Sequence, residues 1–196
     1  IRVSLDHPEI FIAQIRAMIR ASEGIDCYLR IMLPMVSSIA EVDMARQLID
    51  QCVREVEEEG VVFRRPDIGV MIEVPAAVYQ AEALLKRVDF LSVGSNDLVQ
   101  YMLAVDRNNA QVAGLYQEFH PAVLKALKQV ADAAIKAGKG VGICGEMAGN
   151  PGAALLLMAM GYQVLSMNSP NLSANYFYIS PLSITLLIYL LIFSFF

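Results

Sequence analysis

The chain has 196 residues, of which 56% are hydrophobic, and its formal net charge is −5. This length suffices for one domain with a substantial core, and an acidic chain without a basic, aromatic-rich patch is not expected to bind nucleic acid. The three cysteines, with no recognisable signal peptide, predict a reducing, cytoplasmic setting and no disulfide framework.

Helices and strands are predicted to alternate along the first 168 residues. Asp6 is expected to cap the first helix, and Ser38 with Glu41 forms a capping box for a second helix that ends at Gly60. Further helices are expected over 76–86, 121–138 and 151–161. Strands are expected in the apolar runs within 29–35, 68–72, 89–93, 141–144 and 164–167.

Five strand–helix units with nearly continuous apolar strands predict a parallel sheet covered by helices. The spacing alone leaves two architectures open. One is an open doubly wound sheet, and the other is part of a (β/α)₈ barrel.

The C-terminal segment differs in character from the rest of the chain. The last charged residue is Glu146, and residues 176–196 are nearly all apolar. Roughly 20 apolar residues can span a bilayer, but no lysine or arginine flanks this segment. A membrane anchor and a sequence foreign to the domain, as a frameshift or gene truncation would produce, both stay open. We place the predicted domain boundary at 168, with an apolar tail over 169–196.

Three predicted strands end in residues that can carry chemistry. Glu73 follows the run at 68–72, Asn96 and Asp97 follow the run at 89–93, and Cys144 ends the run at 141–144. The carboxyl edge of a parallel sheet is where α/β folds place their active sites. These residues are therefore the first candidates for a functional site.

Two carboxylates at one rim repel each other and favour a cation between them. Glu73 and Asp97 are candidate ligands for Mg²⁺, which takes one or two carboxylates together with substrate oxygens and water. The alternative is a capping aspartate and a rim glutamate that pairs with an arginine.

Two arginines and one cysteine each have two possible roles. Arg107 can bind a phosphate or carboxylate in bidentate fashion, or it can form a surface salt bridge with Asp106 or Asp89. Arg30 lies inside a predicted strand and therefore needs either a structural carboxylate or a bound anion. Cys144 can be a nucleophile or an acid–base group, or it can pack as a small buried hydrophobe.

Several ordered motifs resemble the C-terminal barrel of enzyme I, the phosphoenolpyruvate-protein phosphotransferase of bacterial phosphotransferase systems, and are most similar to its nitrogen-related branch. The resemblance covers residues 1–168 and rests on the segments 29–35 (LRIMLPM), 69–76 (GVMIEVPA), 89–101 (DFLSVGSNDLVQY), 103–109 (LAVDRNN) and 142–149 (GICGEMAG). It implies a partial (β/α)₈ barrel that holds about the last five βα units.

The resemblance also implies a ligand and a role for each candidate residue. The barrel of the family binds phosphoenolpyruvate and Mg²⁺, and its reaction releases pyruvate. The matching positions here are the metal carboxylates Glu73 and Asp97, the phosphate-contacting Asn96 and Arg107 with Arg30 as an additional candidate, and Cys144, which protonates the enolate carbon.

The family implies further parts that this sequence does not contain. These are an N-terminal domain with the phosphoryl-accepting histidine, through which a phosphocarrier protein is reached, and the first barrel strands with further arginines. An apolar tail stands where the family has a closing helix. The intact parent is expected to be a homodimer, and the isolated chain is expected to be inactive. The alternatives are a barrel of pyruvate phosphate dikinase or phosphoenolpyruvate synthase, and a non-catalytic binding or dimerisation module with or without a membrane tether.

Overall fold

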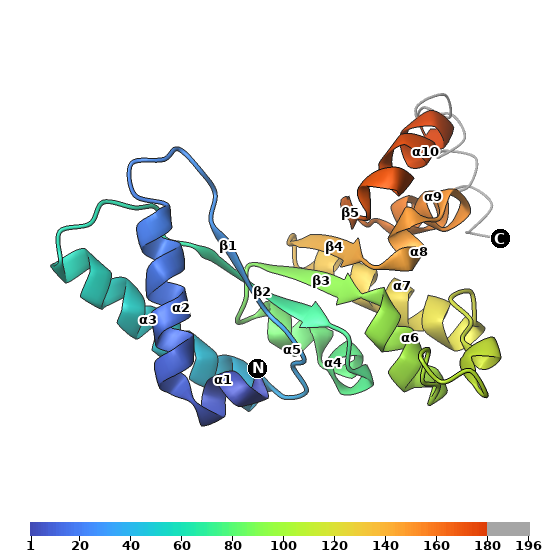
Figure 1. Cartoon of the computed structure of the whole chain (residues 1–196), viewed down its shortest axis with the longest axis horizontal. Helices are drawn as coiled ribbons and strands as arrows, with labels where there is room; N and C mark the ends of the chain where they lie inside the picture. Colours follow the sequence, from blue (N-terminus) through green and yellow to red (C-terminus); the bar gives the residue numbers. More distant parts are fainter. Residues whose placement is uncertain (180–196) are drawn as a thin grey trace.

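The computed structural model describes residues 1–179 and contains one parallel sheet with its helices (Figure 1). The strands are β1 (Arg30–Leu33), β2 (Asp67–Ile72), β3 (Phe90–Gly94), β4 (Gly140–Cys144) and β5 (Val164–Ser166). They lie in the order β1-β2-β3-β4-β5, and every neighbouring pair is parallel. This confirms the predicted parallel sheet.

The strand order decides between the two architectures. A doubly wound sheet reverses its strand order at a switch point and carries helices on both faces. Here the order follows the sequence, and right-handed crossovers then place all the connecting helices on one face. Figure 1 shows α5 and α7 beneath β2, β3 and β4. The fold is therefore a partial (β/α)₈ barrel.

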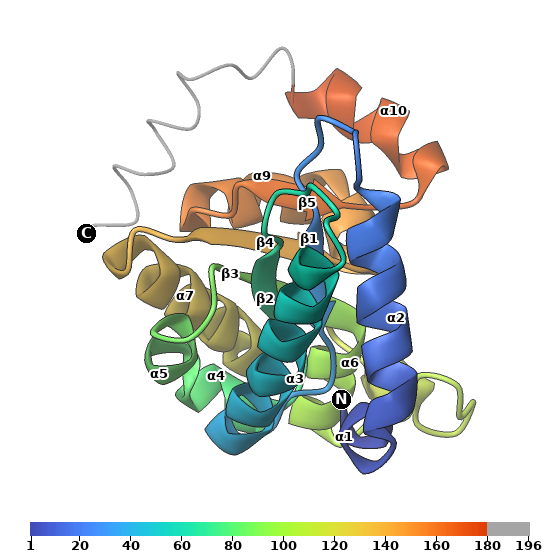
Figure 2. The ribbon, with the colours of Figure 1, turned by 90° about the vertical axis from the view of Figure 1, so that its left-hand side faces the viewer.

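Ten α-helices surround the sheet within residues 1–179. The first two, α1 and α2, precede β1, and α2 lies beside α3 (Figure 2). The bounds are α1 (Arg2–Asp6), α2 (Pro8–Ala21), α3 (Ile39–Glu58), α4 (Pro75–Tyr79), α5 (Ala81–Leu85), α6 (Ser95–Leu103), α7 (Pro121–Lys136), α8 (Glu146–Gly149), α9 (Pro151–Met160) and α10 (Ser169–Ile179).

Helix capping explains where two of the predicted helices begin. The Ser38 side chain accepts from the Glu41 N–H, and the Glu41 carboxylate accepts from the Ser38 N–H at 2.9 Å, so the predicted capping box is confirmed. Asn150 caps α9 by accepting from the N–H groups of Gly152 and Ala153. Both helices thus begin where the sequence places a capping side chain.

Three helical expectations differ from the structure. Asp6 does not cap α2, because it ends α1 and His7 takes the cap position without a side-chain hydrogen bond. The helix expected over 76–86 is divided at Gln80, whose Nε2 donates to the carbonyl of Ser37 at 2.9 Å. Helix α6 was not expected, because it begins directly at the end of β3 without a side-chain cap.

The two faces of the sheet have different surroundings. The side chains of Ile31, Val70 and Leu91 are buried under the helices and belong to the core. The alternate residues of the strands face the inside of the partial barrel, as period-two alternation requires. They line a hollow of about 320 Å³ in which Met32 is 36% exposed.

The C-terminal helix lies against the rest of the fold. α10 begins at Ser169 and packs on α8 and α9, and the Asn175 Nδ2 donates to the Gly149 carbonyl at 2.8 Å. Within residues 1–179, no helix combines the length and the apolar character that crossing a membrane requires. Most of the apolar tail lies outside the described residues, so the boundary at 168 and both hypotheses about the tail stay predictions.

Candidate active site

Glu73, Asp97 and Cys144 lie at one edge of the sheet. β2, β3 and β4 are neighbours in register, with Ile72 paired to Val93 and Gly94 paired to Cys144, so their carboxyl ends lie side by side (Figure 1). Glu73 follows β2, Asp97 lies in the first turn of α6, and Cys144 ends β4. The structure thus brings these three predicted residues together.

The Glu73 carboxylate is buried and held in one position. It is 5% exposed, and its Oε1 accepts from the Met35 N–H at 2.6 Å. A Cβ at Gly94 would lie 2.7 Å from Glu73 Oε2, so the carboxylate needs a glycine at this place. Burial raises the pKa of Glu73, and the neighbouring Asp97 raises it further, against the hydrogen bond from Met35. The carboxylate therefore carries its charge at an energetic cost.

This cost predicts a pH dependence of stability. Because the pKa of Glu73 is raised in the folded state, the folded protein binds this proton more tightly than the unfolded chain does. The free energy of unfolding is then expected to fall as pH rises from the ordinary glutamate pKa through the folded pKa. Glu73→Gln keeps an acceptor for the Met35 N–H and removes the charge. The free energy of unfolding of this variant should therefore change less with pH in this range. At pH values above the folded pKa of Glu73, the variant should be more stable than the wild type.

Urea unfolding of both proteins from about pH 4 to 8 measures this effect. Glu57→Gln, on the exposed face of α3, controls for the change in net charge. A profile of Glu73→Gln that falls as steeply as that of the wild type would contradict the prediction.

Arg107 lies beside the second carboxylate. Its Nη1 is 3.5 Å from Asp97 Oδ1, and about a third of each side chain is exposed. Asp89 and Asp106 accept from backbone N–H groups at 2.8 and 2.9 Å and form no salt bridge with it. The loop arginine is therefore at the carboxyl edge, and the expected salt bridge forms with Asp97 instead.

The Cys144 thiol is half-buried at the same edge. Burial raises its pKa, and the carboxylates of Glu73 and Asp97 raise it further. The thiol therefore keeps its proton at neutral pH. This state suits a proton donor better than a nucleophile, which needs the thiolate.

Two side chains of α6 contact the turn that follows Cys144. The Ser95 hydroxyl donates to the Cys144 carbonyl at 2.9 Å, and Asn96 Oδ1 accepts from the Glu146 N–H at 3.0 Å. Gly145, between these two points, has φ +115°, and a Cβ there would lie 2.2 Å from the Ser95 hydroxyl oxygen. The turn can pack this closely only because residue 145 is glycine.

Gly145→Ala is accordingly expected to destabilise the fold by about 3 kcal/mol, from backbone strain and from the contact with Ser95. Gly138→Ala is the matched control: Gly138 also has positive φ, +65°, but a Cβ there meets nothing within 4 Å. The control should lose only about 1 kcal/mol. Denaturant unfolding measures both variants, and equal losses would contradict the close packing at Gly145.

Arg30 lies at the opposite end of its strand. It begins β1, and its guanidinium carbon is 3.6 Å from the centroid of the Phe90 ring, at the start of β3. The predicted partner of Arg30 is a carboxylate or a bound anion, and the structure provides an aromatic face instead. The structure thus does not bring Arg30 together with the other candidates.

Three residues near the edge were not expected from the sequence to belong to a site: Tyr116, Glu118 and Glu146. Tyr116 is half-buried, its hydroxyl donates to the Asn96 carbonyl at 3.5 Å, and burial raises its pKa to about 12. Burial and the nearby Glu146 raise the pKa of Glu118. All three line a recess of about 670 Å³. No local pattern marks Tyr116 and Glu118, because their positions depend on how the loop after α6 folds.

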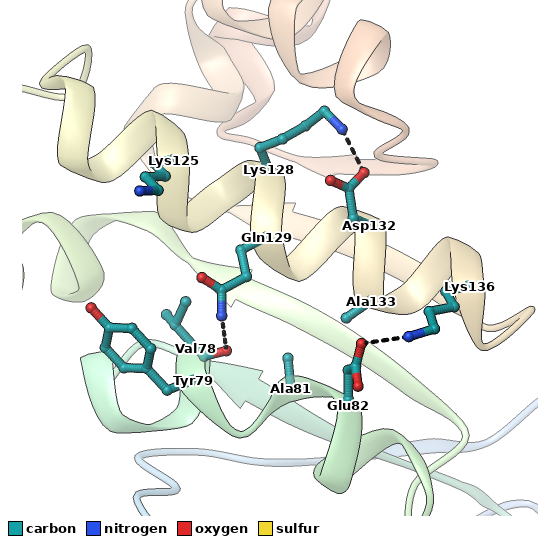
Figure 3. Close-up of a pocket in the computed structure, with 10 residues that line it drawn as sticks. All are labelled: Val78, Tyr79, Ala81, Glu82, Lys125, Lys128, Gln129, Asp132, Ala133 and Lys136. Atoms are coloured by element: carbon teal, nitrogen blue, oxygen red, sulfur yellow. Dashed lines mark hydrogen bonds and ion pairs between the residues drawn. The ribbon is translucent and has the colours of Figure 1, made fainter.

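A second recess lies in the outer helix layer. It measures about 550 Å³ and is formed by α4, α5 and α7 (Figure 3). Lys136 pairs with Glu82 at 3.0 Å and Lys128 with Asp132 at 2.5 Å, so these charges neutralise one another. Of the two places, the carboxyl edge alone combines carboxylates with a protonated thiol, and we assign the candidate site to it.

Comparison with known proteins adds a family match. The protein-family model described as "PEP-utilising enzyme, PEP-binding domain" matches residues 1–179 of the chain. A "Phosphoenolpyruvate-dependent phosphotransferase system" protein of Salmonella typhimurium is 53% identical over 169 residues, covering 86% of this chain and 22% of that protein. A phosphoenolpyruvate-protein phosphotransferase of Haemophilus influenzae is 45% identical over 170 residues, covering 86% and 29%. The chain thus spans less than a third of the length of these relatives.

Solved structures resemble the chain in fold. A citrate lyase from Burkholderia xenovorans LB400 has a TM-score of 0.63 at 18% identity, covering 87% of this chain and 54% of that one. Haloferax volcanii malate synthase has a TM-score of 0.61 at 17% identity, covering 89% and 51%. These likenesses agree with a partial (β/α)₈ barrel and carry nothing beyond the fold.

Proposed function

The chain belongs to the PEP-binding domain family of PEP-utilising enzymes, and from this premise we propose that its carboxyl edge binds phosphoenolpyruvate and acts in phosphoryl transfer to a protein histidine, with release of pyruvate. The observation that carries the proposal is the assembly of Glu73, Asp97 and Cys144 at the ends of three neighbouring strands. Phosphoenolpyruvate brings a phosphate, a carboxylate and a carbon that must be protonated.

A Mg²⁺ ion fits the two carboxylates. Glu73 Oε2 makes no hydrogen bond within residues 1–179, and Asp97 raises the pKa of Glu73, as two negative charges do without a cation between them. Mg²⁺ takes one or two carboxylates and completes its shell with substrate and water, so Glu73 and Asp97 would suffice as its protein ligands. When bound, Mg²⁺ would neutralise charge on the phosphate and the enolate oxygen.

Arg107 and Asn96 are proposed to bind the phosphate. A guanidinium can donate two parallel hydrogen bonds to phosphate oxygens, and Arg107 is already at the edge through Asp97. Because Asn96 Oδ1 accepts from Glu146, its Nδ2 is the group left to donate to an anion. These two residues would hold the substrate while the charge of its phosphoryl group changes.

Cys144 is proposed to protonate the enolate. When the phosphoryl group leaves, the enolate carbon C3 takes the thiol proton: the S–H bond breaks, a C–H bond forms, and pyruvate and a thiolate result. The buried site beside Glu73 and Asp97 disfavours the thiolate, so the thiol is a weak acid that gives its proton to a strongly basic carbon.

The rest of the reaction is proposed for a longer protein. The relatives above are named for the phosphotransferase system, and this chain spans less than a third of their length. The acceptor histidine, the phosphocarrier partner, a homodimer and a cytoplasmic location are therefore proposals for that protein. The names of these relatives favour a phosphotransferase over the alternative dikinase or synthase.

Substrate protection of Cys144 tests the proposal. Alkylation of each cysteine by iodoacetamide is followed by peptide mass spectrometry, with and without phosphoenolpyruvate and Mg²⁺. We expect the ligands to slow the alkylation of Cys144 and to leave that of Cys27 unchanged, since Cys27 precedes β1 at the other end of the sheet. Equal protection of both cysteines, or protection of neither, would refute the assignment.

A further inference from the structure

The residues after β3 and β4 form one connected unit. Gly94 and Cys144 are partners in the register of these two strands, so Ser95 and Gly145 follow side by side. Ser95 is 1% exposed, and its hydroxyl donates to the Cys144 carbonyl at 2.9 Å. The next side chain, Asn96, accepts from the Glu146 N–H. Two consecutive side chains therefore hold the peptide units on both sides of Gly145.

This double contact couples the proposed acid to the proposed metal site. Asp97 is the next residue of α6, so Ser95, Asn96 and Asp97 form one helical turn. A thiol reaches its substrate through one rotatable bond, so the position of the Cys144 backbone decides how far the sulfur lies from the substrate carbon. The Ser95 hydrogen bond fixes that backbone relative to Asp97.

We propose that Ser95 is a positioning residue for proton transfer by Cys144. It acts through the Cys144 carbonyl, which it holds in the position that directs the thiol to C3 of the substrate. This inference rests on the proposed function. Its consequence is a selective defect: removal of the hydroxyl should slow proton transfer while ligand binding by Asp97 and Arg107 is kept.

Proton transfer to and from C3 needs no acceptor histidine, so this single step can be measured on the chain itself by exchange at the methyl group of pyruvate, although complete phosphoryl transfer cannot. In D₂O with Mg²⁺, at an alkaline pD that ionises part of the Cys144 thiol, the thiolate removes one C3 hydrogen of pyruvate, the thiol exchanges with solvent, and a deuteron returns to C3. Nuclear magnetic resonance follows the loss of the methyl signal. We expect Ser95→Ala to slow this exchange about tenfold, because a misplacement of about 1 Å is costly for a reacting group. Its dissociation constant for phosphoenolpyruvate should stay within about twofold of the wild type.

Ser92→Ala is the matched control. Ser92 lies on β3, the strand that leads to Ser95, is 8% exposed and faces the hollow of the partial barrel, where its register partner is Gly142. If Ser95→Ala does not fold, Ser95→Thr and Ser95→Val carry the test, because they have the same shape and differ by the hydroxyl. Threonine should then restore exchange and valine should not.

The pH profile of alkylation separates positioning from general stability. Release of the Cys144 carbonyl should make the thiol more accessible in Ser95→Ala and move the profile at Cys144 to lower pH, while Cys27 in the same sample stays unchanged. If Ser95→Ala matches Ser92→Ala in both exchange and alkylation, the inference is overturned. If the wild type does not exchange, or Cys144→Ala exchanges normally, the proposed function fails and the inference fails with it.

Discussion

Cys144→Ala is expected to lower the exchange of pyruvate methyl hydrogens by about 100-fold or more, because a positioned acid–base group contributes about 10²–10⁴ to a rate. The thiol is half-buried, it keeps its proton at neutral pH, and it ends the strand next to the one that leads to Asp97. Affinity for phosphoenolpyruvate should change by less than about twofold, since the proposed ligands of the metal ion and the phosphate are all kept. The measurement is nuclear magnetic resonance in D₂O, with a parallel binding titration.

Cys27→Ala provides the control for this variant. Cys27 is also half-buried, but it precedes β1. Its replacement therefore removes a thiol at the opposite end of the sheet from the carboxyl edge. Exchange by Cys27→Ala should equal that of the wild type. Normal exchange by Cys144→Ala would remove the acid role from this residue and leave it as a packed side chain.

The second large effect is expected from the two carboxylates. Glu73→Gln and Asp97→Asn should each weaken the binding of a divalent cation in the presence of phosphoenolpyruvate by at least about tenfold, which corresponds to about 1.4 kcal/mol. Each variant keeps the shape of the side chain and removes a charge that Mg²⁺ requires. Titration of Mn²⁺, followed through the electron paramagnetic resonance signal of the free ion, measures this affinity directly.

Asp132→Asn, on the exposed face of α7, controls for the loss of one negative charge from the molecule. It should bind Mn²⁺ as the wild type does. The two site variants should also reduce cation binding more strongly when phosphoenolpyruvate is present, because the ion shares its ligands with the substrate. Wild-type Mn²⁺ affinity in either variant would exclude that carboxylate from the metal site.

The sheet could be predicted because its strands are short apolar runs that end at turn signals. The runs at 68–72, 89–93 and 141–144 correspond closely to β2, β3 and β4. Residue spacing did not choose between a barrel and a doubly wound sheet, since that choice depends on strand order. Helix α6 was not predicted because no capping side chain precedes it. Asp6 was expected to cap the following helix, but it is the last residue of α1, so α2 begins one residue later than predicted.

The place of the candidate site could be predicted for the same reason as the sheet. Parallel strands end together, so Glu73, Asp97 and Cys144 were expected to meet, and they do. The contacts that hold them could not be predicted. The Ser95 hydrogen bond exists only because α6 begins at the end of β3, and the position of Arg30 follows from the start of its strand at the other end of the sheet.

The central claim is that the carboxyl edge of this chain is a site for phosphoenolpyruvate and Mg²⁺. Isothermal titration of phosphoenolpyruvate into the chain, with and without Mg²⁺, tests it most directly. Saturable binding that requires Mg²⁺ and is lost in Asp97→Asn is the predicted result, because Glu73, Asp97 and Arg107 are already assembled. Absence of binding by a chain shown to be folded, or binding that is indifferent to Mg²⁺, would contradict the account.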